Sequence, residues 1–593
     1  MQGSSNPSCG NPSSPPATAI HGAEEPPESA IPGADEPPAR RVVAAHRLPL
    51  RASPDPDSPF GFAFALDPDA LPLQLSRGLP APVTFVGTLP ASAASAVPSD
   101  ELDDYLLENF SCLPVYIDGD QHTAFYDGFC KHYLWPLLHY LLPLAPADLG
   151  DLRFDAAAYR SFVSANMRFA DRVLEVLSPD SGDLVIVHDY HLWVLPTFLR
   201  RKCPRAGVGF FLHSPFPSTD VFRTVPVRED LLRALLNADL VGFHTFDYAR
   251  HFMSACSLLL DIPSHARRGH ISIAYHGRDV LVSILPVGVD MGQLRAALAT
   301  PEAAAKAKEI AEAYRGRTLM VGVDDVDLFK GVDLKLLALE KLLDAEPAMR
   351  GKVVLVQINN PARSRGRDVD GVRGGTDAIR RRINARFAAT GYEPVVMIDG
   401  PVPMWEKVAY YAAADCCVVS AVRDGLNRIA YFYTVCREEG PAAAAAAVDG
   451  GPSAQRTSAV VLSEFVGCSP SLSGALRVNP WNVEAMAEAM HDAVTMHAED
   501  KQARHSRNYN YLRAHDVVAW ARSFDKALQL ACIDRPAMRF IGVGFGMSHR
   551  ALAVTLGEGS SEASPPNPIH PLQTLATCNL FKSTPARSDQ CLV

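Results

Sequence analysis

Two neighbouring strands within residues 183–217 end on side chains that can carry chemistry. The apolar, β-branched run Leu184–Val187 predicts a strand buried on both faces of a parallel sheet, and Asp189 follows it closely. Val208–Leu212 predicts the next strand, and His213 ends it. Ligands of open α/β sheets bind at the carboxyl ends of the strands. The stretch therefore predicts a βαβ unit with Asp189 and His213 as candidate site residues, although such an Asp can also cap the following helix and such a His can be an ordinary buried side chain.

Two segments in the second half of the chain, Lys330 and Asp424–Asn427, are compatible with phosphate binding, but each is a weak indication when taken alone. Lys330 precedes a glycine, and Asp424–Asn427 has the composition of a turn before a helix. A lysine neutralises phosphate charge, and a helix that begins after a glycine-containing turn presents backbone N–H groups to an anion. Each has an ordinary alternative, because Lys330 could be a solvated surface lysine and Asp424–Gly425 a simple turn.

The segments around these candidates alternate between strand and helix patterns. Apolar runs of strand length alternate with amphipathic segments in both halves, which predicts an α/β protein of two doubly wound domains facing a cleft. We expect the first Rossmann-like domain at 41–285 and the second at 286–546, with an unstructured insertion at 440–458. The composition of residues 1–40 and 547–593, with few large apolar groups, predicts a disordered leader and a disordered tail.

The composition excludes several classes of function. The 593 residues carry a net charge of −10, so the chain lacks the basic stripe of a nucleic-acid-binding protein. No apolar run of membrane-spanning length is free of Pro, His and charge, and the first residues lack the pattern of a signal peptide, so we expect no membrane association. The 12 cysteines include no C-x-x-C pair, which predicts reduced core residues of a cytoplasmic protein rather than a zinc or redox site.

Several short strings, taken in order along the chain, resemble one known family. They are His188–Leu192, Phe211–Pro217, Val225–Glu229, Gly242–Phe252, Lys330–Gly331, Asp424–Asn427, Leu462–Phe465 and Asn479–Trp481. Together they resemble the glucosyltransferase domain of trehalose-6-phosphate synthases, over about 41–546. Gly322–Asp327 and Tyr126–Lys131 resemble the plant class II branch of that family in particular.

The resemblance implies the GT-B glycosyltransferase fold, with the active site in the cleft between two Rossmann-like domains. It also implies retaining transfer of glucose from UDP-glucose to glucose 6-phosphate, with no metal and no other cofactor. The matching motifs imply catalytic roles for Asp189, His213 and Asp424. The implied acceptor-binding residues are Arg47, Tyr126, Trp135 and Arg363, and the implied donor-binding residues are Lys330, Gly425, Leu426, Asn427 and Glu464.

One departure from the family pattern reverses a charge. Active synthases carry an arginine five residues before the phosphate-binding lysine, and here that position is Asp325. At about 4 Å and an effective dielectric constant of about 20, one charge pair contributes on the order of 4 kcal/mol. Losing that attraction alone would slow transfer by about three decades. Alternatively, Asp325 turns away from the phosphates and pairs with a neighbouring cation.

Further departures affect both substrates. Phe432 stands where retaining GT-B enzymes usually have a carboxylate for the ribose hydroxyls, and loss of a charged acceptor costs roughly 1.5–3 kcal/mol. Arg428 replaces an apolar residue and would restore a positive charge near the diphosphate. His46 replaces the family's asparagine, and Pro54–Asp57 replaces a double glycine that lets the loop close over phosphate.

Two functions are therefore consistent with the sequence. The first is a trehalose-6-phosphate synthase of weak or lost activity. The second is a non-catalytic, sugar-phosphate-sensing regulatory protein that acts through partners, such as a protein kinase or other trehalose-phosphate synthase subunits. Class II members also carry a phosphatase-like domain; Ile541–Gly546 resembles the start of the linker to it, but no D-x-D-x-T nucleophile loop is present, so we expect no phosphatase activity.

Overall fold

The computed structural model describes residues 39–80, 82–141, 153–178, 182–267, 269–361, 367–440 and 457–533. All of these residues belong to one compact unit. The expected leader 1–40, insertion 440–458 and tail 547–593 fall almost wholly outside the described residues, and so does the expected acceptor-binding residue Arg363.

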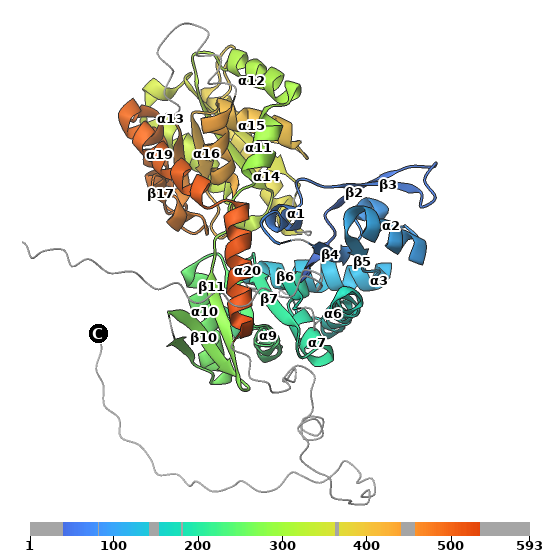
Figure 1. The fold of residues 1–593 in the computed structure, drawn as a ribbon. Coiled ribbons are helices and arrows are strands. Elements are labelled where there is room, and N and C mark those ends of the chain that lie inside the picture. Colours follow the sequence, from blue (N-terminus) through green and yellow to red (C-terminus); the bar gives the residue numbers. More distant parts are fainter. Residues whose placement is uncertain are drawn as a thin grey trace, which may run out of the picture. The chain divides into compact units, whose positions relative to one another are not determined.

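The first sheet has nine strands and lies within residues 41–284 (Figure 1). Their spatial order is β5-β4-β1-β6-β7-β8-β11-β10-β9. The pairs are parallel as far as β11, and β10 and β9 then extend the sheet in antiparallel fashion. The strands are β1 (Arg41–Arg47), β4 (Val83–Thr88), β5 (Cys112–Pro114), β6 (Leu184–His188), β7 (Gly207–Leu212), β8 (Leu240–Phe243), β9 (Ser264–Arg267), β10 (His270–Tyr275) and β11 (Arg278–Ile284).

The second sheet has six strands, all parallel, in the order β14-β13-β12-β15-β16-β17. These are β12 (Thr318–Asp325), β13 (Val353–Asn360), β14 (Val395–Asp399), β15 (Cys416–Val419), β16 (Ala459–Ser463) and β17 (Leu476–Val478). A separate antiparallel hairpin joins β2 (Leu50–Pro54) to β3 (Phe62–Leu66). It contains Pro54–Asp57, the segment that replaces the family's double glycine.

Helices connect the strands of both sheets (Figure 1). In the first half they are α1 (Leu71–Ser76), α2 (Asp100–Phe110), α3 (Gly119–His122), the π-helix η2 (Thr123–Leu134), α4 (Trp135–Leu138), α6 (Ala156–Val176), α7 (Leu195–Lys202), α8 (Thr219–Phe222), α9 (Arg228–Leu235) and α10 (Phe246–Leu260). In the second half they are α11 (Met291–Leu298), α12 (Pro301–Ala313), α13 (Val332–Ala345), α14 (Arg367–Phe387), α15 (Met404–Ala413), α16 (Ile429–Glu439), α18 (Val483–Thr495), α19 (Ala498–Ala514) and α20 (Val517–Ile533). Short 3₁₀ turns are η1 (Ala91–Ala93), η4 (Tyr190–Leu192), η5 (Leu328–Lys330), η6 (Pro347–Met349) and η7 (Ser469–Ser471).

Within the parallel part of each sheet the strand order reverses direction once, and these reversals place the functional residues. The chain order turns back between β1 and β6 in the first sheet and between β12 and β15 in the second. In doubly wound sheets the ligand crevice opens at the carboxyl ends of the strands beside such a reversal. Arg47 ends β1 and Asp325 ends β12, while Asp189 directly follows β6. The predicted doubly wound α/β fold is therefore confirmed.

The last described helix, α20, returns to the first sheet. It contacts β7, β8 and β11, and in Figure 1 it lies beside these strands although it is the most C-terminal element drawn in colour. Trp520 and Phe524 are buried in one continuous core with Phe211 of β7 and with strands of the second sheet. In sequence the helix lies within the expected second domain, 286–546, but it packs on the first sheet.

Candidate active site

Two adjoining cavities open at the carboxyl ends of the strands. The smaller, about 320 Å³, is lined mainly from the second half, including Asp325, Lys330 and Asn427. The larger, about 930 Å³, is lined mainly from the first half, including Arg47 and Asp189. Leu71, Trp135, His213 and Asp424 line both cavities. Two of the three predicted catalytic residues, His213 and Asp424, therefore lie where the cavities meet.

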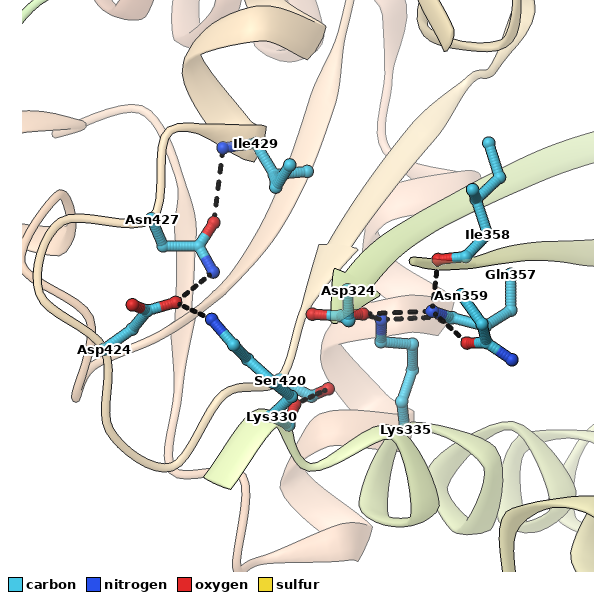
Figure 2. Close-up of polar contacts among 10 residues, drawn as sticks. All are labelled: Asp324, Lys330, Lys335, Gln357, Ile358, Asn359, Ser420, Asp424, Asn427 and Ile429. Carbon is cyan, nitrogen blue, oxygen red and sulfur yellow. Dashed lines mark hydrogen bonds and ion pairs between the residues drawn. The ribbon is translucent and has the colours of Figure 1, made fainter. Parts of the chain in front are cut away.

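Asp424 organises the loop between β15 and α16 (Figure 2). Its Oδ1 accepts a hydrogen bond from its neighbour's backbone, Gly425 N, at 2.9 Å, and its Oδ2 accepts one from Asn427 Nδ2 at 3.0 Å. Asn427 Oδ1 in turn accepts from Ile429 N at 3.2 Å, at the start of α16. Asn427 has a left-handed φ of 59°, a conformation that asparagine tolerates better than most residues. The segment Asp424–Asn427 therefore does form a loop directly before a helix, α16.

Glycine is required where this loop meets the first half of the chain. A Cβ on Gly425 would lie 2.0 Å from the carbonyl oxygen of His213. Because that contact is with backbone, no side-chain movement would relieve it. The Asp424 loop is therefore held against the end of β7. Tyr248 of α10 adds a hydrogen bond of 2.8 Å from its hydroxyl to the carbonyl oxygen of Asp424.

Lys330 is an ion-pair partner of Asp424 in this structure. The Nζ–Oδ2 distance is 2.6 Å, and the two side chains are 10% and 14% exposed. Gly331, with φ of 60°, lets the chain turn directly after this lysine, and a Cβ there would lie 2.4 Å from the carbonyl oxygen of Ser420. The Lys330 side chain points toward Asp424 (Figure 2), and Lys330 lines the smaller cavity. The two motifs that suggested a donor site are thus brought together.

Asp324 and Asp325 are adjacent in sequence but differ in environment. Asp324 is buried and accepts hydrogen bonds from Lys335 Nζ at 2.6 Å and Gln357 Nε2 at 3.1 Å (Figure 2). Asp325 is half-buried at the end of β12 and lines the smaller cavity together with Lys330. Asp324 therefore has a buried ion pair with Lys335, and both Asp324 and Asp325 line the smaller cavity.

Arg428 and Phe432 line the same cavity at the start of α16. The Arg428 guanidinium carbon lies 5.1 Å from the centre of the Phe432 ring, within cation–π range. Its Nη1 donates to Oε1 of Gln74, on α1 of the first half, at 3.0 Å. The aromatic ring at the expected ribose position is therefore covered by a cation that also bridges to the first half of the chain.

The remaining residues that are predicted to bind the donor differ in their positions relative to the two cavities. Leu426 and Asn427 line the smaller cavity, while Gly425 lines the larger one. Glu464 follows β16, is exposed, and lines neither of these two cavities; its backbone N donates to the carbonyl oxygen of Val478 at 2.9 Å. Glu464 is therefore not part of either cavity wall, although Val466, two residues further along, forms an isolated bridge with Asp424.

Asp189 is held in a strained and highly bonded position. Its φ is 67°, which is unusual for a residue with a Cβ. Its Oδ1 accepts from His213 N at 3.1 Å, Ser214 N at 3.2 Å and Ser214 Oγ at 3.2 Å. Burial raises the pKa of Asp189, while these hydrogen bonds and the charge of Lys131 oppose the rise. The bonds fix the carboxylate between two strand ends, at the wall of the larger cavity.

Histidines surround the junction of the cavities. His188 Nδ1 and His213 Nε2 lie 2.9 Å apart. Burial lowers the pKa of His213 well below its usual range, and it lowers the pKa of His188 to about 4 and that of His244 to about 3. The imidazoles are therefore neutral at pH 7, so they can donate or accept hydrogen bonds to uncharged sugar hydroxyls.

The predicted acceptor residues gather in the larger cavity as a stack of rings. His46 stacks on Tyr126 with ring centres 4.4 Å apart and on His191 at 4.9 Å. The guanidinium of Arg47 lies 5.7 Å from the centre of the Tyr126 ring. Trp135 is buried at 7% exposure, and its Nε1 has no hydrogen-bond partner among the described residues. His46, which replaces the family's asparagine, thus forms part of the stack rather than facing solvent.

Sequence reasoning missed several residues of the cavity walls. They are Lys131, His139, His188, His244, Asn360 and Tyr411, together with Gln74, which lines neither cavity but accepts a hydrogen bond from Arg428 of the wall. Lys131 stood inside a string that indicated the family branch, and its spacing of four residues from Trp135, which puts both on one helix face, was the available signal. Gln74 lies in a short helix after the hairpin and carries no recognisable motif.

The described residues contain neither a membrane-spanning helix nor a metal-binding group. No described helix is both long and apolar enough to span a bilayer. No three His, Cys, Asp or Glu side chains of the described part of the chain come together as a metal-binding group.

Comparison with known proteins places this geometry in a family. The profile of glycosyltransferase family 20 matches residues 39–530. The chain is 50% identical over 515 residues to the probable alpha,alpha-trehalose-phosphate synthase [UDP-forming] 9 of Arabidopsis thaliana, which is 86% of this chain and 59% of that protein. The chain therefore spans about three fifths of the length of such relatives.

Solved structures agree. The Burkholderia xenovorans alpha,alpha-trehalose-phosphate synthase in complex with glucose-6-phosphate has a TM-score of 0.68 at 26% identity, covering 83% of this chain and all of that one. The N-terminal domain of Candida albicans trehalose-6-phosphate phosphatase has a TM-score of 0.70 at 25% identity, covering 86% of this chain and all of that one. The expected GT-B fold is thus confirmed. The chain belongs to glycosyltransferase family 20, the family of the trehalose-6-phosphate synthases.

Proposed function

We propose that this chain binds glucose 6-phosphate in the larger cavity and transfers glucose to it from UDP-glucose slowly or not at all. One observation carries the proposal: Asp325 lines the same cavity as Lys330 and the Asp424 loop. A diphosphate leaving group gains negative charge during transfer, and cations or backbone N–H groups must stabilise it. An additional carboxylate in that wall works against this stabilisation.

The ribose end of the donor site supports the same proposal. Phe432 offers no acceptor for ribose hydroxyls, and the guanidinium of Arg428 lies over its ring. Losing a charged acceptor weakens binding by roughly 1.5–3 kcal/mol. Arg428 contributes positive charge to the cavity, but its bond to Gln74 holds it toward the first half of the chain. We therefore propose that donor binding is weaker than acceptor binding.

On the acceptor side, three of the four residues that the resemblance assigns to glucose 6-phosphate line one cavity, and the fourth, Arg363, lies outside the described residues. Arg47, Tyr126 and Trp135 line it together with Asp189. We propose that no metal or other cofactor takes part, so charge neutralisation depends on cations of the chain such as Lys330. The transfer itself would occur where the cavities meet, beside His213 and Asp424.

The second candidate is a regulatory protein that senses sugar phosphate in the larger cavity. The observation that favours it is the distribution of the departures, because Asp325, Arg428 and Phe432 all lie in the smaller cavity. Such a protein would act in the cytoplasm through partners such as a protein kinase or other trehalose-phosphate synthase subunits. These partners and this location are part of the proposal.

Calorimetry with UDP-glucose, UDP and glucose 6-phosphate added separately tests the proposal. We expect glucose 6-phosphate to bind, and the two uridine ligands to bind at least about tenfold more weakly. An assay for UDP release in the presence of both substrates then separates the two candidates. Micromolar donor binding with rapid turnover would reject the proposed impairment, and absence of any glucose 6-phosphate binding would reject both candidates.

A further inference from the structure

Lys131 is a buried cation on the wall of the larger cavity. Its side chain is 6% exposed and lines the cavity together with Arg47, Tyr126 and Trp135. Nζ donates a hydrogen bond to the hydroxyl of Tyr190 at 3.0 Å. Burying an ammonium group is unfavourable unless surrounding groups compensate for lost hydration. The groups that surround Lys131 therefore indicate the role of its positive charge.

Three aromatic rings surround the ammonium group. Nζ lies 4.6 Å from the ring centre of Trp135, 5.3 Å from that of Tyr126 and 5.7 Å from that of Tyr190. The negative faces of aromatic rings attract a cation within about 6 Å. Unlike a carboxylate, however, they do not cancel its charge. The rings thus stabilise a positive charge at the cavity wall, and this charge also acts on the carboxylate of Asp189, which lines the same cavity.

The π-helix η2 is what places these groups together. An α-helix has about 3.6 residues per turn, whereas the i→i+5 bonding of a π-helix takes in roughly one residue more. Side chains four or five positions apart then lie above one another. Tyr126, Lys131 and Trp135 have this spacing across η2 and the start of α4. In an α-helix Tyr126 and Lys131 would point to different faces.

A second cation and an unsatisfied donor approach the same place. The Arg47 guanidinium lies 5.7 Å from the Tyr126 ring centre, so two cations flank one ring. The buried Trp135 Nε1 lacks a hydrogen-bond partner among the described residues and can only donate. His46, whose pKa is lowered by burial and then by the charges of Arg47 and Lys131, stays neutral beside them. Two cations and a free donor match an anion with several acceptor oxygens.

We propose that Lys131 is a further acceptor-binding residue, which selects the dianionic form of a sugar phosphate over a singly charged or neutral sugar. The inference rests on the proposed binding of glucose 6-phosphate in the larger cavity. Arg47 sits exposed at the edge of this site, whereas Lys131 forms its enclosed side. A charged hydrogen bond in an enclosed site discriminates by about ten- to a hundredfold.

Calorimetry with glucose 6-phosphate and glucose 6-sulfate, without donor and at pH 7.5, tests the proposal. The two ligands have similar shapes, but the sulfate ester carries one negative charge and the phosphate ester nearly two. We expect the unmodified chain to prefer the phosphate by about tenfold or more. Lys131→Gln should reduce this preference to about twofold or less, and Lys131→Arg should retain most of it. Lys308→Gln, an exposed lysine on α12, makes the same change in net charge and should leave the preference unchanged.

The preference ratio separates binding from folding, because a merely structural lysine would weaken both ligands alike. Equal affinity of the unmodified chain for the two esters would overturn the proposal, and this measurement needs no variant to fold. A Lys131→Gln protein that keeps the full preference would also overturn it. Failure of the proposed transfer reaction would appear only in the UDP-release assay and leaves this ratio untouched.

Discussion

Lys330 and Asp424 neutralise each other in the smaller cavity, with Nζ and Oδ2 2.6 Å apart. Lys330 comes from the turn after β12, and Asp424 from the loop after β15, so the pair joins the two strands at which the second sheet reverses its order. A diphosphate entering this cavity must share the ammonium with Asp424. The same pair therefore shapes the smaller cavity and reduces the positive charge that Lys330 can offer to a ligand.

Removing either partner should destabilise the fold, and a double-mutant cycle should show that the two effects are coupled. Breaking a largely buried ion pair leaves one charge uncompensated, which typically costs about 3–5 kcal/mol. In urea unfolding, we expect Lys330→Met and Asp424→Asn each to lower the free energy of unfolding by a sizeable part of this amount. The double variant should lose less than the sum of the two single losses. Additive losses would show that the two side chains do not interact in solution.

The charge reversal at Asp325 and the ring at Phe432 predict a gain of binding on reversion. The double change Asp325→Arg with Phe432→Glu should increase affinity for UDP by at least about tenfold in calorimetry, because it restores a cation and an acceptor to one cavity. Asp500→Arg, at an exposed position on α19, serves as a matched charge control and should change nothing. Unchanged UDP affinity in the double variant would remove Asp325 and Phe432 from the donor site.

The strand ends of the site could be predicted from the sequence because buried parallel strands are short apolar runs that end on polar residues. Asp189 and His213 are predicted in this way, whereas Asp424–Asn427 is predicted by the resemblance to the family. The pattern could not show that Lys330 pairs with Asp424, since they are far apart in sequence and meet only through the sheet order. Lys131 could not be predicted for another reason. An α-helical periodicity puts it on a different helix face from Tyr126, and only the π-helical geometry aligns the two side chains.

The return of α20 to the first sheet was also beyond local patterns, and it yields a stability prediction. Phe524 is fully buried, and its ring fits over Gly209 and Gly242, where an added Cβ would lie 3.0 and 3.1 Å from it. Phe524→Ala should lower the free energy of unfolding by about 3–5 kcal/mol, because it removes a large buried ring and leaves a cavity. Chemical denaturation measures this loss, and Leu530→Ala, at a partly exposed position of the same helix, should cost much less.

The buried histidines predict that stability falls on mild acidification. Burial lowers the pKa of His188 to about 4 and the pKa values of His139 and His244 to about 3, against about 6.5 in an unfolded chain. Below pH 6.5 the unfolded state therefore binds more protons than the folded state. The stability that each neutral histidine contributes is fully present above pH 6.5 and is lost at about 1.4 kcal/mol per pH unit as the pH falls toward the folded pKa.

Urea unfolding at pH 7.5 and pH 5.5 measures this loss, and His188→Gln tests its source. The glutamine cannot titrate, so the variant should lose about 1 kcal/mol less than the unmodified chain between the two pH values, even if it is less stable at both. Asp189 acts in the opposite sense, because burial raises its pKa and the folded carboxyl therefore binds a proton before the unfolded one does. Since that contribution stabilises the fold only as the pH falls toward 3.8, a loss that begins near pH 6.5 belongs to the histidines. An identical loss in His188→Gln would show that His188 takes up its proton over the same pH range in the folded and the unfolded protein, and that its ring is not enclosed as the contact with His213 implies.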